Sequence, residues 1–304
     1  MKKEIGIVGL GKIGGNIARR LSRSGWRVVG YNRTRDVTQA FEQEGIDAAY
    51  SIDELIAKLT KPRVILTILT SGKPTDEILE SLLKYLEPGD IIIEGANSYY
   101  KDTIRRSKFA EKKGIKFIDV GISGGPGGAL SGACLMVGGN RELFDQLKPL
   151  FETMAKPEAV AHFEGIGAGH FVKMVHNGIE YGMMQSIGEG FNILKNSPYN
   201  PDLSEVARIY NNGSVVESRL IGWLKSAFAK FGQDLKDVSG AVGFTGEAEY
   251  TVETARELKL PMEIIVGSVE FRKDSQRHPS FIGKILTAMR NQFGGHSIEP
   301  GKMT

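Results

Sequence analysis

The chain has 304 residues, of which 41% are hydrophobic and 25% charged, as in soluble globular proteins of one or two domains. Its formal net charge is only +3, which gives no reason to expect a nucleic-acid or membrane-surface partner. Cys134 is the only cysteine, so an intrachain disulfide is excluded. No apolar run is long enough for a spanning helix or resembles a signal peptide, and we expect a cytoplasmic location.

Short apolar runs alternate with amphipathic segments over the first half of the chain. The predicted strands cover residues 5–8, 27–31, 64–69, 91–94, 116–120 and 135–138. The predicted helices cover residues 13–24, 38–45, 52–58, 75–86, 104–113 and 145–154. Strands that alternate with helices of this length predict a parallel sheet with helices on both faces.

The pattern changes after about residue 163, where strand-like runs give way to helical periodicity. Helices are predicted near residues 171–194, 203–211, 215–231, 251–258, 264–274 and 281–293. The glycine-rich segment 165–169 marks the expected boundary. We therefore predict an α/β Rossmann-type N-terminal domain, residues 1–164, followed by an all-α C-terminal domain, residues 165–304.

Residues 9–14 read G-L-G-K-I-G, which matches the G-x-G-x-x-G pattern of dinucleotide-binding turns. The segment follows the first predicted strand and opens the first predicted helix. Gly9 permits a tight turn, Gly11 lets a pyrophosphate approach the backbone, and Gly14 lets the helix pack on the strand. The N-terminus of the helix offers free N–H groups to the phosphates. The alternative is a turn that binds nothing.

The end of the second predicted strand favours NADP over NAD. NAD sites usually carry an acidic residue here, whereas this chain reads Tyr-Asn-Arg-Thr at residues 31–34. The guanidinium of Arg33 can pair with a 2′-phosphate, and Asn32 and Thr34 can add neutral hydrogen bonds. The alternative is that Arg33 is a solvated surface charge. The predicted cofactor-binding residues are Gly9, Leu10, Gly11, Lys12, Ile13, Gly14, Asn32, Arg33, Thr34, Leu69, Thr70 and Asn97.

Segment 121–129 directly follows a predicted strand and is rich in glycine. We expect a loop that exposes backbone N–H groups and lets a ligand approach closely, with Ser123 able to bind a carboxylate or hydroxyl. Its position at the carboxyl end of a strand is where open α/β sheets bind ligands. The alternative is a flexible connection without a ligand.

Polar residues share one face of the helix predicted from residue 171. Lys173, His176, Asn177, Glu180 and Tyr181 are spaced three or four apart, and an apolar set covers the opposite side. A buried lysine here could have a lowered pKa and act as a base. The alternative is a solvated lysine–glutamate salt bridge.

A further candidate segment, residues 289–296, lies near the end of the chain. Its Arg290 and His296 could serve an anionic substrate. The alternative is a frayed helix with a solvated arginine.

Six segments together resemble 6-phosphogluconate dehydrogenase, decarboxylating, in its short form. They are residues 9–14, 32–34, 94–98, 122–125, 170–181 and 290–296. The similarity runs from residue 5 to 296, and the helix from Lys173 to Tyr181 is its most specific part.

The resemblance implies a reaction. Lys173 would take the proton of the C3 hydroxyl while hydride leaves for the nicotinamide, and the 3-keto acid would lose carbon dioxide. Glu180 would protonate the enediol at C1 to give ribulose 5-phosphate, and Asn177 would be the third catalytic residue. The pathway implied is the pentose phosphate pathway or gluconate utilisation.

The resemblance also implies binding residues and partners. Those for the carboxylate and hydroxyls would be Asn97, Ser123, Gly124, Gly125, His176 and Asn177. Those for the phosphate would be Tyr181, Arg272 and Arg290, with His296 nearby. A homodimer or homotetramer is implied, in which the C-terminal arginine and histidine complete a neighbour's site. No metal is expected.

One segment departs from the family. Where the family usually has glycine, a basic residue and tryptophan, this chain has Ala248, Glu249 and Tyr250. The glutamate would repel a phosphate that the basic residue helps to hold, although Arg272 and Arg290 could suffice, or Lys273 or Arg277 could substitute. The preferred acid could therefore be unphosphorylated.

Two other readings stay open at this point. The first is a β-hydroxyacid dehydrogenase of the 3-hydroxyisobutyrate or tartronate semialdehyde type. The second is an inactive protein that senses a dinucleotide or serves as a scaffold.

Overall fold

The computed structural model describes residues 2–243 and 246–299. The chain forms two compact units, Met1–Met174 and Val175–Thr304. The first holds an eight-stranded, mostly parallel sheet with helices, and the second is helical, which confirms the predicted fold class. A continuous helix, α8 (Ala168–Lys195), begins in the first unit and ends in the second. Because no linker separates the units, the boundary predicted after residue 164 stays a prediction.

The first unit is built on one sheet with the strand order β3-β2-β1-β4-β5-β6-β7-β8. All neighbouring pairs are parallel except β6 and β7, which are antiparallel. Its elements before α8 are β1 (Glu4–Val8), α1 (Lys12–Arg23), β2 (Arg27–Tyr31), α2 (Arg35–Gln43), β3 (Asp47–Ala49), α3 (Ile52–Lys58), β4 (Val64–Thr67), α4 (Lys73–Leu82), β5 (Ile91–Glu94), α5 (Tyr100–Glu111), β6 (Lys116–Ser123), α6 (Gly125–Ser131), β7 (Ala133–Gly139), α7 (Arg141–Met154) and β8 (Ala155–Glu164).

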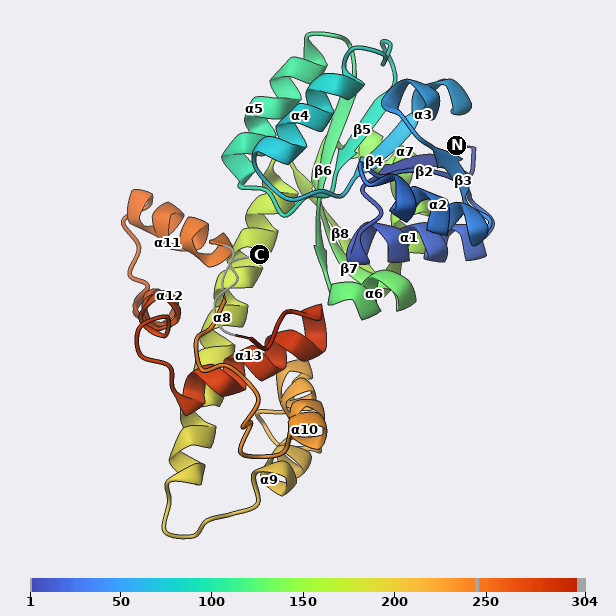
Figure 1. Ribbon diagram of the computed structural model, residues 1–304. Coiled ribbons are helices and arrows are strands. Elements are labelled where there is room, and N and C mark those ends of the chain that lie inside the picture. Colours follow the sequence, from blue (N-terminus) through green and yellow to red (C-terminus); the bar gives the residue numbers. More distant parts are fainter. Residues whose placement is uncertain (1, 244–245, 300–304) are drawn as a thin grey trace. The chain divides into compact units, whose positions relative to one another are not determined.

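Helices cover both faces of this sheet (Figure 1). Ile5 and Ile7 of β1 lie in a core with α1, α2 and α7, whereas Val8 lies in a second core with α3, α4 and α5. Successive strand residues point to opposite faces, so strands buried on both sides need continuous apolar runs. This is why the strands of the first half could be recognised from their sequence.

Three elements of the first unit were missed. β3 and β8 lie at the two edges of the sheet, where one side of a strand is less buried and the apolar pattern is weak. The expectation of a loop over residues 121–129 was wrong. β6 continues to Ser123, and α6 begins at Gly125 with a proline in its first turn, a position where the missing N–H of proline costs nothing.

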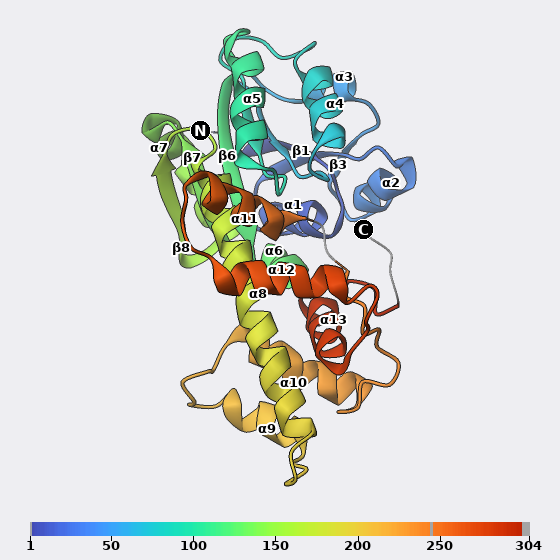
Figure 2. The same cartoon turned by 90° about the vertical axis from the view of Figure 1, so that its left-hand side faces the viewer.

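The second unit packs its helices around a separate core. After α8 come α9 (Leu203–Tyr210), α10 (Arg219–Phe231), α11 (Glu247–Glu257), α12 (Glu263–Asp274) and α13 (Phe281–Gly294). α9, α10 and α13 share a core with Met184 and Phe191 of α8. α11 and α12 lie against α8 at Gly178, whose missing side chain leaves room for Thr251 and Ile265 (Figure 2).

The helices of this unit start where local signals place them. α10 begins at Arg219 and not at residue 215 as predicted, because the Ser218 hydroxyl accepts a hydrogen bond from the Ile221 N–H and caps the helix there. Val215 is fully exposed. Throughout residues 2–243 and 246–299, no helix combines the length and the apolar character needed to cross a membrane.

Candidate functional site

The turn between β1 and α1 has the backbone that a dinucleotide requires. Gly9 has a φ of 100°, and a Cβ there would stand 2.1 Å from the Ile68 carbonyl oxygen. A Cβ on Gly14 would stand 1.9 Å from the Gly9 carbonyl oxygen. A Cβ on Gly11 would meet nothing within 4 Å, so the space beside it is open. Gly11 is the N-cap of α1 and makes no side-chain hydrogen bond to the helix. The N-terminus of a helix is a place where phosphate groups bind.

The segment after β2 is tied to this turn. The Asn32 Oδ1 accepts the Leu10 N–H at 3.1 Å, so Asn32 shapes the glycine turn itself. Arg33 and Thr34 are exposed. Among the described residues no carboxylate forms an ion pair with Arg33, and the residues that end β2 include no acid.

The remaining predicted cofactor residues lie in the segments that follow other strands of the sheet. Lys12 is exposed at the start of α1, and Ile13 packs against the first core. Leu69 is half-buried against the second core, and Thr70 is exposed after β4, with its carbonyl accepting the Thr75 hydroxyl at 2.8 Å. Asn97 is half-buried after β5. All these residues belong to the first unit.

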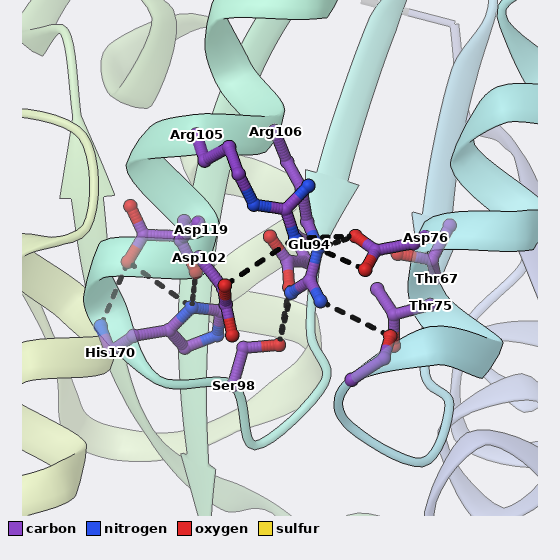
Figure 3. A network of polar contacts seen from close by, with 12 residues as sticks. Thr67, Thr75, Asp76, Glu94, Ser98, Asp102, Arg105, Arg106, Asp119 and His170 are labelled. Carbon is purple, nitrogen blue, oxygen red and sulfur yellow. Dashed lines mark hydrogen bonds and ion pairs between the residues drawn. The ribbon is translucent and has the colours of Figure 1, made fainter. Parts of the chain in front are cut away.

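A buried ion pair supports the segment that carries Asn97 (Figure 3). Arg106 of α5 donates to Glu94 Oε1 and to the Ser98 hydroxyl, both at 2.8 Å. Ser98 in turn donates to Glu94 at 2.5 Å. Arg106 and Glu94 are 3% and 0% exposed, so both ends of the segment around Asn97 are held inside the protein.

The same arginine also reaches the segment after β4. Arg106 donates through Nε to Asp76 at 2.7 Å and through Nη2 to the Gly72 carbonyl at 3.2 Å. The segments before α4 and α5 are therefore braced by one buried guanidinium, as Figure 3 shows. The sequence interpretation missed this network.

Lys173 lies against the backbone of β6. A Cβ on Gly121 would stand 2.4 Å from the Lys173 Cβ, so the stem of the lysine fills the space that a side chain would need. Lys173 is only 7% exposed. Ser123 ends β6 and is half-buried, and Gly124 and Gly125 follow with φ angles of 123° and 63°. Gly125 is the first residue of α6, so the backbone that follows it forms the first turn of that helix.

α8 buries its polar residues more deeply than the expected amphipathic pattern suggests. Asn177 and Tyr181 are 5% and 7% exposed, whereas Ile179 and Met183 are 53% and 44% exposed. His176 and Glu180, one turn apart, are partly buried, and the His176 Nδ1 lies 3.2 Å from the Asn177 Oδ1 and 3.9 Å from the Glu180 Oε2. Of the predicted substrate residues of α8, Asn177 and Tyr181 are thus buried in protein, and His176 is partly exposed.

Two buried arginines flank Tyr181 in the second unit. Arg272 is 1% exposed, and its guanidinium carbon lies 3.3 Å from the centre of the Tyr181 ring. Its Nε and Nη1 have no hydrogen-bond partner within the described part of the chain. Burial lowers the pKa of Arg272 to about 10, and the nearby Arg290 adds to this shift. Burial also lowers the pKa of Arg290, which is 7% exposed.

This arrangement favours an anion. A buried charge without a counter-ion costs free energy, and a bound anion would offset that cost. Burial raises the pKa of Tyr181, so its hydroxyl stays protonated and can donate to the same anion.

Other predicted residues of the second unit lie around this cluster or apart from it. Lys273 and Glu249 form an ion pair on the partly exposed surface. Glu249 stands where the family usually has a basic residue, and Lys273 is one of the residues that could replace that basic residue. The glutamate therefore pairs with a candidate replacement. Glu247 lies near enough to Arg290 for its charge to affect the pKa of that arginine. His296 follows α13, with its carbonyl accepting the Asn291 side chain at 2.7 Å. Arg277 is exposed after α12.

Two family profiles match the chain. The NAD binding domain of 6-phosphogluconate dehydrogenase matches residues 4–169, and the C-terminal domain of 6-phosphogluconate dehydrogenase matches residues 169–279. The chain belongs to the 6-phosphogluconate dehydrogenase family. It is therefore an oxidoreductase with an NAD(P)-binding domain.

Relatives of full length support membership of the 6-phosphogluconate dehydrogenase family. YqeC of Bacillus subtilis, whose name gives a 6-phosphogluconate dehydrogenase only provisionally, is 40% identical over 296 residues, covering 97% of this chain and 99% of that protein. The NAD(+)-dependent, decarboxylating 6-phosphogluconate dehydrogenase of Haloferax volcanii is 34% identical over 296 residues, covering 97% and 98%.

A solved structure agrees. The 6-phosphogluconate dehydrogenase of Plasmodium falciparum, described with NADP+ and with 6-phosphogluconate, matches with a TM-score of 0.82 and 31% identity. The match covers 90% of this chain and 62% of that chain. The two named cofactors differ between these relatives, so family membership alone does not select NADP or NAD.

The sequence interpretation did not single out the buried polar residues that support the segments of this site in the first unit. Asp119, His170, Arg106 and Glu94 are all buried and polar in the first unit. Glu94 ends the otherwise apolar strand β5, and Asp119 interrupts the apolar residues of β6, which is a signal that could have singled them out.

Proposed function

We propose that this protein oxidises and decarboxylates 6-phosphogluconate to ribulose 5-phosphate and carbon dioxide, with reduction of NADP. The observation that carries the reaction is the deeply buried Lys173, which precedes Glu180 by seven residues on the continuous helix α8. Residues seven apart share one face of an α-helix at a rise of about 10 Å. This supports an amine and a carboxylic acid that serve the same sugar chain.

The residues of the chain would then act as follows. Lys173 accepts the proton of the C3 hydroxyl, and the nicotinamide supplies the hydride acceptor when it is bound. Asn97, Ser123 and the backbone at Gly124 and Gly125 bind the carboxylate and hydroxyls. After carbon dioxide leaves, Glu180 donates a proton to C1, with His176 and Asn177 beside it on α8.

The preference for a phosphorylated acid is supported by Arg272 and Arg290. Both are buried, and Arg272 keeps unpaired N–H groups among the described residues. Guanidinium groups bind phosphate oxygens through two hydrogen bonds, so the pair suits a phosphate at the distal end of the substrate. The ion pair between Glu249 and Lys273 favours a second candidate, an unphosphorylated sugar acid, because it removes one positive charge.

The site for NADP fits the residues present. Gly11 leaves open space and provides no side-chain cap to α1, and Arg33 is exposed where a 2′-phosphate would lie. We expect Arg33→Ala to raise the KM for NADP roughly 10- to 100-fold and to leave the KM for NAD unchanged. Arg23→Ala, at the other end of α1, removes the same charge and serves as the control. An unchanged KM for NADP in Arg33→Ala would contradict the assignment.

The reaction is tested by a substrate screen. Purified protein is assayed with 6-phosphogluconate, gluconate, 3-hydroxyisobutyrate and glycerate, each with NADP and NAD, and carbon dioxide release is measured beside cofactor reduction. We expect turnover of 6-phosphogluconate with equal amounts of carbon dioxide and NADPH. Turnover of gluconate alone would favour the second candidate, and reduction of the cofactor without carbon dioxide would favour a β-hydroxyacid dehydrogenase. Cofactor binding without any turnover would indicate a sensor or scaffold.

A further inference from the structure

The start of α8 is held by a carboxylate that lies far away in the sequence. Asp119 of β6 is fully buried at 0% exposure. Its Oδ1 accepts the Gly167 N–H at 2.6 Å, and its Oδ2 accepts the His170 N–H at 2.8 Å. The N–H groups at a helix start have no acceptor within the helix. One side chain of the sheet therefore caps the start of α8, with its first donor, the Gly167 N–H, 48 residues further along the chain. Figure 3 shows Asp119 beside His170.

Glycines bring this first turn into direct contact with the sheet. A Cβ on Gly138 of β7 would stand 2.2 Å from the Gly169 nitrogen and 2.7 Å from the Asp119 Oδ1. A Cβ on Gly169 would stand 2.3 Å from the Met136 carbonyl oxygen. The atoms nearest to these two glycines are backbone atoms and the carboxylate oxygens of Asp119, so a shift of the helix start would disturb the contact with the strands directly.

The same contact surface carries Lys173. The lysine lies one turn after Gly169 on α8, and its stem occupies the space beside Gly121 of β6. Asp119 and Gly121 are two residues apart on one strand. A change in how Asp119 holds the helix start is therefore transmitted to the lysine over about one helical turn, roughly 5 Å.

Helix α5 also contacts the start of α8. The Nδ1 of His170 lies 2.8 Å from the Thr103 hydroxyl of α5. The same Nδ1 lies 3.8 Å from Asp119, and among the described residues no lysine or arginine forms an ion pair with this aspartate. The side chain of His170 is as buried as that of Asp119.

An aspartate at this place costs stability. Burial raises the pKa of Asp119, against the lowering effects of His170 and of the two N–H bonds. A carboxylate whose folded-state pKa lies above its unfolded value destabilises the folded protein once the pH exceeds the unfolded value. A neutral Ser or Asn can cap a helix without that cost, so stability alone does not account for the charge.

We infer that Asp119 is a positioning residue for Lys173, whose carboxylate fixes the start of α8 on the sheet and thereby sets where the lysine amine lies. This inference rests on the proposed function, in which Lys173 is the base. It adds a residue of the sheet, remote from the reacting atoms, to the requirements of the oxidation step.

The test measures the position of Lys173 and the oxidation step separately. In Asp119→Asn one acceptor oxygen becomes an NH₂ group that opposes a backbone N–H. The rate at which trinitrobenzenesulfonate modifies Lys173, followed by peptide mass spectrometry, should rise about fivefold or more because the stem of the lysine is no longer held against Gly121. With 6-phosphogluconate and NADP, kcat should fall about 20-fold or more at an NADP Kd within about twofold of wild type. The deuterium isotope effect on kcat with substrate deuterated at C3 should rise.

Asp90→Asn is the matched control. Asp90 is also a buried aspartate of the first unit, at 1% exposure, and accepts the Arg63 and Glu87 N–H groups at 2.7 and 3.0 Å. It lies before β5, at the opposite end of the strands from Lys173. Asp90→Asn should lower Tm without changing the modification of Lys173 or the isotope effect.

The outcomes separate this inference from the function on which it rests. Wild-type values of Lys173 modification and kcat in Asp119→Asn would overturn the inference, and so would equal changes in Asp90→Asn. If the wild-type protein oxidises none of the acids tested, the proposed function is wrong, and the modification rate of Lys173 still decides whether Asp119 places it. If Asp119→Asn does not fold, Gly121→Ala displaces the lysine stem directly. That variant should lose kcat at unchanged NADP affinity, and wild-type kcat there would also count against the inference.

Discussion

At the scale of single residues, two buried cations have different surroundings. Lys173 has its stem against the bare backbone at Gly121. Arg272 is enclosed by Tyr181 and Met184, which offer a π-face and a sulfur atom but no carboxylate. Under the proposed function, the amine of Lys173 would accept a proton and the charge of Arg272 would be neutralised by the bound anion.

Lys173→Met should remove turnover and leave the fold intact. Methionine keeps the apolar stem and loses the amine, so we expect kcat to fall by about 10³-fold with little change in Tm. Cofactor binding, measured by quenching of protein fluorescence, should be unchanged. Lys195→Met is the control, since Lys195 ends the same helix and pairs with Asp234 at 2.6 Å on the surface. Residual turnover within tenfold of wild type would remove Lys173 from the role of base.

The pKa of Arg272 predicts how substrate binding depends on pH. Only the charged guanidinium attracts an anion, and in the empty site burial lowers the pKa of this group to about 10. The charged form therefore costs the empty protein about 3 kcal/mol of stability below pH 10, and this cost disappears as the pH rises further toward the ordinary pKa of arginine. An anion that binds should recover much of this free energy.

We expect the Kd for 6-phosphogluconate to rise about tenfold per pH unit above pH 10. Isothermal titration calorimetry between pH 8 and 11 measures it, with uptake of a proton on binding near the upper limit. Arg272→Met should bind more weakly and lack this dependence, which separates Arg272 from other groups that titrate in the range. A constant Kd up to pH 11 would show that the anion binds elsewhere.

At the scale of elements, the glycines of the β1–α1 turn have separable roles. Gly14 lets α1 approach the strand, because a Cβ there would overlap the Gly9 carbonyl. Gly11 has open space, so its role concerns a ligand and not the fold.

Gly14→Ala and Gly11→Ala should therefore differ. The first should lower the free energy of unfolding by about 2 kcal/mol or more, measured by urea denaturation, through the contact of 1.9 Å with backbone. The second should change it by less than about 0.5 kcal/mol and still weaken NADP binding, since its methyl group takes space near the pyrophosphate. Equal destabilisation by both would contradict this division.

At the scale of the whole molecule, the second unit exposes apolar side chains on neighbouring helices. Ile179 and Met183 of α8 are 53% and 44% exposed, and Ile264 of α12 is 70% exposed. Ile264 lies beside Gly182, which stands between Ile179 and Met183 in the sequence of α8. An exposed patch of this kind favours contact with another protein surface. We propose a second copy of the chain as the partner.

Light scattering coupled to size exclusion should accordingly give at least twice the chain mass of 33.2 kDa. Ile264→Glu should shift the protein toward the monomer, because a buried carboxylate at the interface would be unpaired. Val215→Glu, at a fully exposed residue before α10, is the control. A monomeric wild type would exclude the assembly, and with it a C-terminal segment that completes a neighbour's site.

The periodicity of the sequence by itself determined most of the fold. Strands buried on two faces and helices with one apolar face leave local patterns, and 27–31, 91–94 and 52–58 were placed at their observed bounds. The glycine turn was likewise recognisable, since the steric demands of a tight turn are local. Edge strands and α6 escaped because their stability comes from neighbours that the local pattern does not contain.

Only the tertiary structure decided which polar residues are buried and what holds them. Arg272 looks like any basic residue of a surface helix until α12 packs on α8 and encloses it. Asp119 interrupts an apolar run in the sequence, and its two hydrogen-bond donors follow 48 and 51 residues later. Desolvation and capping of this kind depend on contacts between distant segments, and a sequence read locally carries no record of them.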